Sequence, residues 1–266
     1  MELSLSSSPS RLIAAWPALP LILASLLSLA GCQTPKSVAP APAPKAEETS
    51  TQQRAQAFGR QFSAVLVRNA VAANSQALEG TVDLVAKIDR QNRLVACEIR
   101  PNAQASAAPA LESLARQVCW DSVFPEVPAE MYGPEKVQVI VAPLVFPALD
   151  ESERQSRARA VEAYERSRFF WAQGLGKERF DSIGRAHLRF VADAQGQVQE
   201  CLVNLNPVEE RWSAFKPDSA LQARLTAQCK QINLRQMPGF ALDETGLAHG
   251  SVMVEYAPWK GGSQHR

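Results

Sequence analysis

Cysteine and histidine are the residue types from which this chain of 266 residues would build reactive or metal-binding chemistry, and it has five cysteines and three histidines. A zinc site favours C-x-x-C pairs or histidines at ligand spacing, and redox-active cysteines usually form C-x-x-C. Neither arrangement occurs, because His187, His249 and His265 are dispersed and the cysteines lie far apart. The sequence therefore predicts no metal site, and it favours disulfide or lipid chemistry for the cysteines.

Other catalytic signatures are missing or weak. The sequence contains no G-x-S-x-G, Walker loop, H-E-x-x-H or dinucleotide fingerprint. Residues 213–216 match S-x-x-K in form, but the accompanying S-D-N is absent. The arginines of 154–168 are interleaved with glutamates, which is typical of a solvated helix face, and the net charge of +1 gives no electrostatic argument for nucleic acid. We expect no enzymatic activity, no cofactor and no nucleic-acid partner.

Four of the cysteines occur in two matching settings. Gly80 and Cys97 are 17 residues apart, and so are Gly184 and Cys201. Residues between them match in register: Leu84 with Leu188, Asp89 with Asp193, Asn92 with Gly196, and Leu94 with Val198. A further block, "VQVIVAP" at 137–143, aligns with "VMVEYAP" at 252–258. The sequence therefore indicates an internal duplication.

Each copy has the same order of expected elements. Apolar residues at helical spacing predict helices over 55–73 and 151–173. Two alternating strands follow, joined by a tight turn at Asn92 or Gly196, and then a helix with Pro109 or Pro217 near its first turn. The last strand is expected to stop at Ala-Pro. The fold class is α+β: two tandem α-β-β-α-β repeats, 53–147 and 148–260, each a small antiparallel sheet backed by helix, with a disordered tail at 261–266.

The cysteines of each copy are expected to face one interface. In the second strands, Val95, Cys97 and Ile99 share a face, and so do Cys201, Val203 and Leu205. On the helices, Cys119 and Cys229 each follow an inward leucine by eight residues. Four cysteines allow three connectivities, and one of them, Cys97–Cys119 with Cys201–Cys229, keeps each bond inside its own repeat. We predict these two disulfides, which an oxidising compartment favours.

The N-terminal segment has the layout of a signal peptide. Residues 12–31 are largely apolar and follow Arg11, and residues 29–32, Leu-Ala-Gly-Cys, resemble a bacterial lipobox. This resemblance implies a signal peptide over 1–31 and lipid attachment at Cys32, with an uncleaved signal anchor as the alternative. Gln33, in place of an aspartate, implies the periplasmic face of the outer membrane, with the inner membrane as the alternative. Residues 32–52 are rich in Ala and Pro and are expected to form an extended tether.

The repeated unit resembles the TonB C-terminal domain family over 75–147 and 180–259. The resemblance lies in the turns "KIDRQN" and "VADAQG", the inward cysteine that follows, the short helix, and a Phe-Pro or Met-Pro step at 124–125 and 237–238. An "SSG" stretch often found after the second strand is replaced by "RPNAQAS" and "NLNPVEE". The uncleaved N-terminal helix of an energy transducer is replaced by the lipoprotein signal, so the resemblance implies the fold and the binding mode but not energy transduction.

In the TonB family the last strand lies at a sheet edge and accepts an extended peptide of a partner. We expect the side chains of Val137, Val139 and Val141, and of Val252, Val254 and Tyr256, to face the core. The candidate binding edge then consists of Gln138, Ile140, Met253 and Glu255. These features predict a lipid-anchored module that binds a periplasmic or outer-membrane protein. The alternatives are a structural component whose two modules pair edge to edge, and an envelope hydrolase with an unrecognised site.

Cys32→Ser is expected to yield an unlipidated protein, because the predicted attachment site is lost. Metabolic labelling with a fatty-acid analogue should mark the parent chain and leave the variant unlabelled. Equal labelling of the two chains would remove the lipoprotein interpretation.

Overall fold

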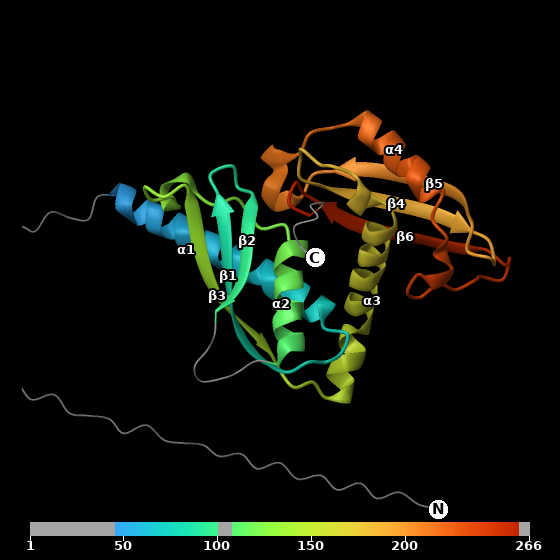
Figure 1. The fold of residues 1–266 in the computed structure, drawn as a ribbon, viewed down its shortest axis with the longest axis horizontal. Coiled ribbons are helices and arrows are strands. Elements are labelled where there is room, and N and C mark those ends of the chain that lie inside the picture. The colour runs from blue at the N-terminus through green and yellow to red at the C-terminus, as the bar shows by residue number, and fades with distance from the viewer. Residues whose placement is uncertain (1–45, 101–107, 261–266) are drawn as a thin grey trace, which may run out of the picture. The chain divides into compact units, whose positions relative to one another are not determined.

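The computed structural model describes residues 46–100 and 108–260, which form a mixed α+β fold (Figure 1). The predicted signal peptide 1–31, the lipid attachment site Cys32 and the tail 261–266 lie outside the described residues. Among the helices that the structure describes, none combines the length and the apolar character needed to cross a membrane.

The predicted α-β-β-α-β order occurs twice. The first module contains α1 (Ala46–Ala73), β1 (Gly80–Asp89), β2 (Leu94–Arg100), α2 (Pro109–Asp121) and β3 (Val137–Phe146). The second contains α3 (Glu151–Gln173), β4 (Gly184–Ala192), β5 (Val198–Asn206), α4 (Ser219–Cys229) and β6 (Ala248–Tyr256). The two antiparallel sheets are separate, with strand orders β2-β1-β3 and β5-β4-β6. The last strand of each module is therefore an edge strand.

The two hairpin turns form as the sequence predicts. Asn92 and Gly196 have φ angles of 56° and 81°, in the left-handed region that favours these residue types. In each turn an aspartate side chain, Asp89 or Asp193, accepts hydrogen bonds from the backbone N–H groups two and four residues later. The turn chemistry is thus duplicated together with the strands.

Helix boundaries also follow local chemistry, with one correction. Asp150 and Glu153 form a reciprocal capping box at the start of α3, and Pro109 lies in the first turn of α2. However, α1 begins at Ala46, so residues 46–52 of the predicted tether are helical. The Ala-Pro alternation ends at Pro44, and residues 46–52 contain no proline or glycine that would oppose a helix.

The alignment of the last strands was wrong. The first residue of β1 pairs with the last residue of β3, and the first residue of β4 pairs with the last residue of β6. Pro143 is therefore equivalent to Met253, whereas the sequence alignment had matched it with Pro258. β3 does not stop at Pro143 but continues to Phe146, because an edge strand tolerates a proline on its free side.

The alignment shifts by five positions. Because side chains alternate between the two faces of a strand, a shift by an odd number of residues exchanges the two faces of β3. Val139 and Val141, which were expected in the core, are 43% and 44% exposed. Ile140, which was expected outside, packs against the core of the first module, and Gln138 lies on the same face as Ile140. In β6 the expected faces hold, because Val252, Val254 and Tyr256 are buried and Met253 is exposed.

A second correction concerns Val95, which is exposed rather than on the inward face. The pairing of β1 with β2 skips this residue: Ile88 pairs with Leu94, and Lys87 pairs with Ala96. Such a bulge leaves one residue of the strand without a partner and turns its side chain. The strand recovers its expected facing at Cys97, which is buried.

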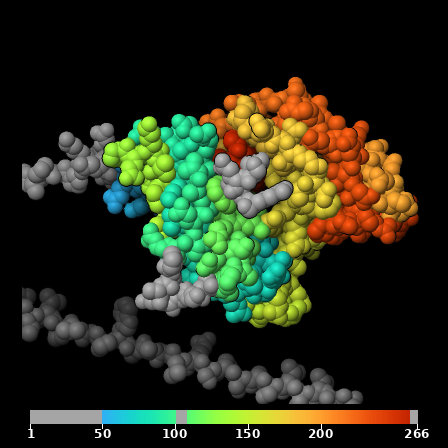
Figure 2. Space-filling model, in the orientation of Figure 1, coloured from blue at the N-terminus to red at the C-terminus, as the bar shows by residue number. Residues whose placement is uncertain are grey.

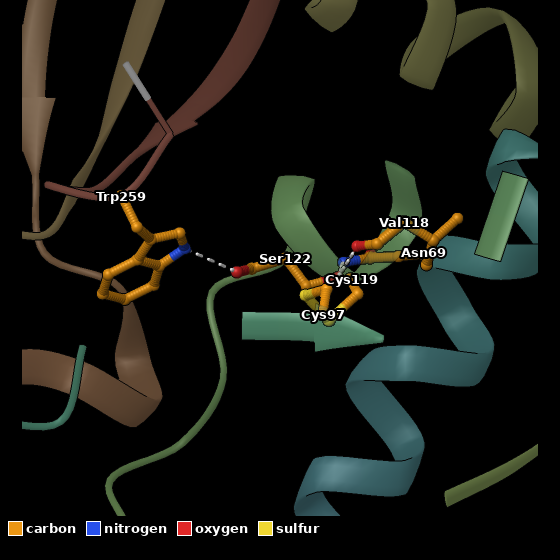
Figure 3. The surroundings of a disulfide bond; sticks show 6 residues. All are labelled: Asn69, Cys97, Val118, Cys119, Ser122 and Trp259. Atoms are coloured by element: carbon orange, nitrogen blue, oxygen red, sulfur yellow. Dashed lines mark hydrogen bonds between the residues drawn. A yellow bond between two sulfur atoms is a disulfide. The ribbon is translucent and has the colours of Figure 1, made fainter. Parts of the chain in front are cut away.

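Both predicted disulfides, Cys97–Cys119 and Cys201–Cys229, are formed. Each joins the second strand of a module to the helix that covers it, and all four cysteines are buried. Disulfides of this kind are typical of an oxidising, extracytoplasmic compartment. Figure 3 shows the first bond between its strand and its helix, close to the end of α2.

The two modules are not independent, because the second contributes to the core of the first. Ile183, Val208, Ala257 and Trp259 are buried in the same cluster as Phe62, Leu84 and Val118. The sheet of the second module keeps a separate core between β4–β6, α4 and the C-terminal part of α3. The described residues of both modules belong to one compact unit.

Replacing Cys97 and Cys119 by alanine is expected to lower the free energy of unfolding by about 3 kcal/mol, because the crosslink restricts the unfolded chain. Urea denaturation followed by circular dichroism measures the change. The matched control is the double alanine variant of Cys201 and Cys229, which opens a loop of 28 residues rather than 22 and should lose as much or slightly more. Unchanged midpoints in both variants would contradict a stabilising role.

Candidate binding surfaces

The C-terminal end of the second module is held on the first by Trp259. Its indole Nε1–H donates to the carbonyl oxygen of Ser122, at 3.3 Å, just beyond α2 (Figure 3). The hydroxyl of Ser122 donates to the carbonyl of Val118 at 2.6 Å and accepts from Asn69 Nδ2 at 2.9 Å. The disulfide-bonded Cys119 lies in the same turn of chain. These contacts fix the segment after β6 against a part of the first module that is already crosslinked.

Arg211, on the 3-10 helix Glu209–Ala214, forms a second junction contact. It is 4% exposed, and its Nη1 donates to the carbonyl oxygens of Asn92 and Phe124, both at 3.2 Å. Burial lowers the pKa of Arg211, and the negative charge of Glu126 opposes this effect. The guanidinium thus binds the hairpin turn of the first module from the second.

Tyr164 of α3 joins the end of α2 to the second module. Its hydroxyl donates to Asp121 Oδ2 at 2.8 Å and accepts from Gln117 Nε2 at 3.2 Å, and Arg168 Nη1 donates to the same carboxylate oxygen at 3.2 Å. Burial raises the pKa of Tyr164 well above its usual range, and Asp121 adds to the rise. The phenol therefore stays protonated and serves as a fixed donor.

A cleft of about 920 Å³ lies beside this junction, between α1, α3, β6 and the 3-10 helix Glu209–Ala214. Lys260 is part of its lining; its Nζ donates to the carbonyl oxygen of Glu255 at 2.9 Å and lies 5.2 Å from the centre of the Trp171 ring. Burial lowers the pKa of Lys260, while Asp121 and Glu255 oppose the change. The cleft has the size of a ligand site and contains a partly desolvated cation.

The second surface is the free edge of β3. Its backbone direction follows from the equivalent strand of the second module, β6. There the carbonyl of Glu255 accepts from Lys260 and so points away from β4. Val145 of β3 is the residue equivalent to Glu255. Because pairing alternates along an antiparallel strand, Val139, Val141, Pro143 and Val145 turn their backbone groups to the free edge. Proline at one of these positions agrees with this direction, since no ladder bond needs its N–H.

The side chains at these four positions form an apolar row on the outer face of the sheet. Val139, Val141 and Val145 are 43%, 44% and 61% exposed, and Pro143 is exposed as well. In Figure 2 the yellow-green atoms of β3 lie at the rim of the first module, beside those of β1 and β2. The sequence of β3 contains no charged residue. This row, Val139, Val141, Pro143 and Val145, is called the β3 edge below.

Of the four predicted edge residues, the two in β6 lie at the positions expected from the sequence and the two in β3 do not. Met253 lies on the outer face of β6, and Glu255 lies beside it, 3.6 Å from Arg185 across the sheet. Gln138 and Ile140 do not belong to the outward row, although the amide of Gln138 donates to the carbonyl of Val139 at 3.2 Å. The β6 edge is charged and is met by Lys260, whereas the β3 edge is apolar.

The described residues that were considered as catalytic or metal-binding candidates in the sequence do not come together in one site. Ser213 donates to Glu126 at 3.3 Å and Lys216 lies 3.3 Å from Asp181, so each member of the S-x-x-K pattern has a different acidic partner. Within 46–100 and 108–260, no three histidine, cysteine or acidic residues are grouped so that they could hold a metal ion. Arg211 is buried and Lys260 is half-buried, and nothing in the local sequence distinguishes either residue from an ordinary surface cation.

Comparisons with protein-family models, with curated proteins and with solved structures give no match to this chain.

Arg211→Ala is expected to lower the free energy of unfolding by about 1–3 kcal/mol, because two buried carbonyl groups lose their donor. The matched control, Arg189→Ala, removes an exposed arginine of β4 and should change stability by about 0.5 kcal/mol or less. Urea denaturation compares the two variants. If both behave alike, Arg211 does not hold the modules together.

Proposed function

We propose that this chain is a non-catalytic, lipid-anchored periplasmic protein that binds an extended segment of a partner protein along the β3 edge. The observation that carries the proposal is the combination of outward backbone groups and exposed valines on an edge strand without charge. A long apolar edge strand is a template for another strand, and soluble proteins normally protect such edges. A bound strand would provide that protection.

Backbone and side chains of β3 contribute different parts of the recognition. The N–H and C=O groups of Val139, Val141 and Val145 can pair with any extended backbone, which provides affinity without a sequence requirement. Their side chains select β-branched or aromatic neighbours, since such cross-strand pairs contribute roughly 0.2–1 kcal/mol each. The backbone of Pro143 has a carbonyl that accepts a hydrogen bond and no N–H that donates one, so the partner strand needs no acceptor opposite this residue. An apolar, extended partner segment fits these properties.

The family and the location are parts of the same proposal. The repeated α-β-β-α-β order with its last strand at an edge supports a TonB C-terminal-like module. The two disulfides support a periplasmic location, and residues 29–33 support lipid attachment at Cys32 and the outer membrane, with the inner membrane as the alternative. Energy transduction is not part of the proposal.

A structural role in an envelope complex is the second candidate, and the shared core of the two modules favours it. Its edge-to-edge form lacks support, because β3 and β6 belong to separate sheets among the described residues. Among the described residues the modules join through buried side chains, and no strand pairs with the free edge of β3.

Val141→Pro is expected to abolish partner binding and to leave the fold intact. The substitution removes an N–H at the free edge, and Pro143 shows that β3 accommodates proline two residues further on. The measurement is crosslinking and capture from intact cells, with stability checked by urea denaturation and expected to change by about 1 kcal/mol or less.

The matched control is Ser251→Pro, which places proline in β6 at the exposed position equivalent to Val141 and outside the lining of the cleft. It should keep the partners. The proposal fails if a folded, monomeric Val141→Pro variant captures every partner that the parent chain captures.

A further inference from the structure

The cleft between the modules borders the backbone of β6. Met253, Val254 and Glu255 all line it, although their side chains alternate between the two faces of the sheet. Three consecutive residues of a strand reach one cavity when the edge of the strand, rather than one face, forms its wall. Met253 has the same backbone direction as Glu255, so its N–H and C=O point into the cleft.

The side chain of Lys260 lies at the C-terminal end of the β6 edge. The chain turns after β6 and returns the ammonium group to the carbonyl of Glu255, at 2.9 Å. An ammonium group has three donors, so Lys260 has donors beyond the one that Glu255 accepts. A strand added along β6 would have to end at this cation.

The neighbouring carboxylates are engaged elsewhere. Asp121 accepts from Tyr164 and Arg168, and the carboxylate of Glu255 lies 3.6 Å from Arg185. The cleft also contains Arg68 on α1, and its other two acids are Glu209 and Glu210, on the 3-10 helix. The lining thus has four cations and four carboxylates, but Lys260 forms no salt bridge with any described carboxylate, so its remaining donors can hold the carboxylate of a ligand.

The rim of the cleft is apolar. Trp212 and Met253 are 71% and 58% exposed and both line the cleft. On the facing wall, Ala160 and Ala163 of α3 are small and leave space opposite the strand. An exposed tryptophan beside a methionine is suited to cover an apolar side chain of a ligand.

We propose that this cleft binds the C-terminal residues of an extended peptide, with the terminal carboxylate on Lys260, the backbone along β6 at Met253, and an apolar side chain against Trp212. The peptide runs parallel to β6, because that direction places its C-terminus at the cation. The opposite direction would bring an N-terminal ammonium to Lys260. This site lies on β6 and does not depend on the β3 edge.

The test uses two immobilised mixtures of hexapeptides with randomised sequence, one ending in a free carboxylate and one in an amide. The probe is the full mature chain with Cys32→Ser. We expect retention by the free-acid mixture to exceed retention by the amide mixture by tenfold or more. Equal retention, or no retention by either mixture, would overturn the proposal. Inhibition by N-acetylglycine as strong as that by free-acid hexapeptides would also overturn it, since a small carboxylate would then suffice.

Lys260→Met should remove the preference for the free acid, and Lys216→Met, which changes an exposed lysine paired with Asp181, should keep it. Should Lys260→Met fail to fold, Trp212→Ser changes an exposed side chain and is expected to weaken retention at least fivefold. A preference that persists in folded Lys260→Met, or unchanged retention of Trp212→Ser, contradicts the site. Val141→Pro should retain the free-acid preference, so this outcome is independent of partner binding at the β3 edge.

Discussion

The completion of the first module's core by residues of the second is the constraint on which the other features depend. Trp259 and Arg211 reach across the junction and donate hydrogen bonds to backbone carbonyls next to α2 and the first hairpin turn. Burying the Arg211 guanidinium is costly, and its Nε has no partner among the described residues. Three carbonyl contacts and the charge of Glu126 offset part of that cost. Because the junction is packed, the cleft beside it exists before any ligand binds.

The duplicated modules keep one backbone arrangement and present different chemistry on it. Equivalent positions of the last strands point the same way, so Val145 corresponds to Glu255 and Pro143 to Met253. In β3 these positions are apolar and open, and a partner strand would desolvate no charge. In β6 the edge carries a carboxylate and ends at Lys260, so an incoming strand must satisfy a cation. Two copies of one fold can therefore select different segments.

Local chemistry made much of this fold predictable from the sequence, and long-range packing explains the failures. The aspartate turns, the capping box at Asp150 and the cysteine pairing depend on residues close in sequence or on a repeated spacing. Pro143 and Pro258 looked equivalent because both follow alanine, yet the pairing of β3 with β1 decides the register. The bulge at Val95 has no sequence marker. Arg211 and Lys260 resemble ordinary surface cations in the sequence, and Arg211 is buried through its contacts with Asn92 and Phe124 of the other module.

The packed junction also governs how the two proposed surfaces would act together. Linking two sites raises the effective concentration of the second binding event when the linker can span both sites. In this chain the β3 edge and the cleft are held by one compact unit, so the span is set by the protein. Only a partner whose own two segments match that span would gain from both. A partner with one segment at the β3 edge would bind with the affinity of a single strand. Loosening the Arg211 or Trp259 contacts would weaken the binding of a two-segment partner and leave that of a one-segment partner at the β3 edge unchanged.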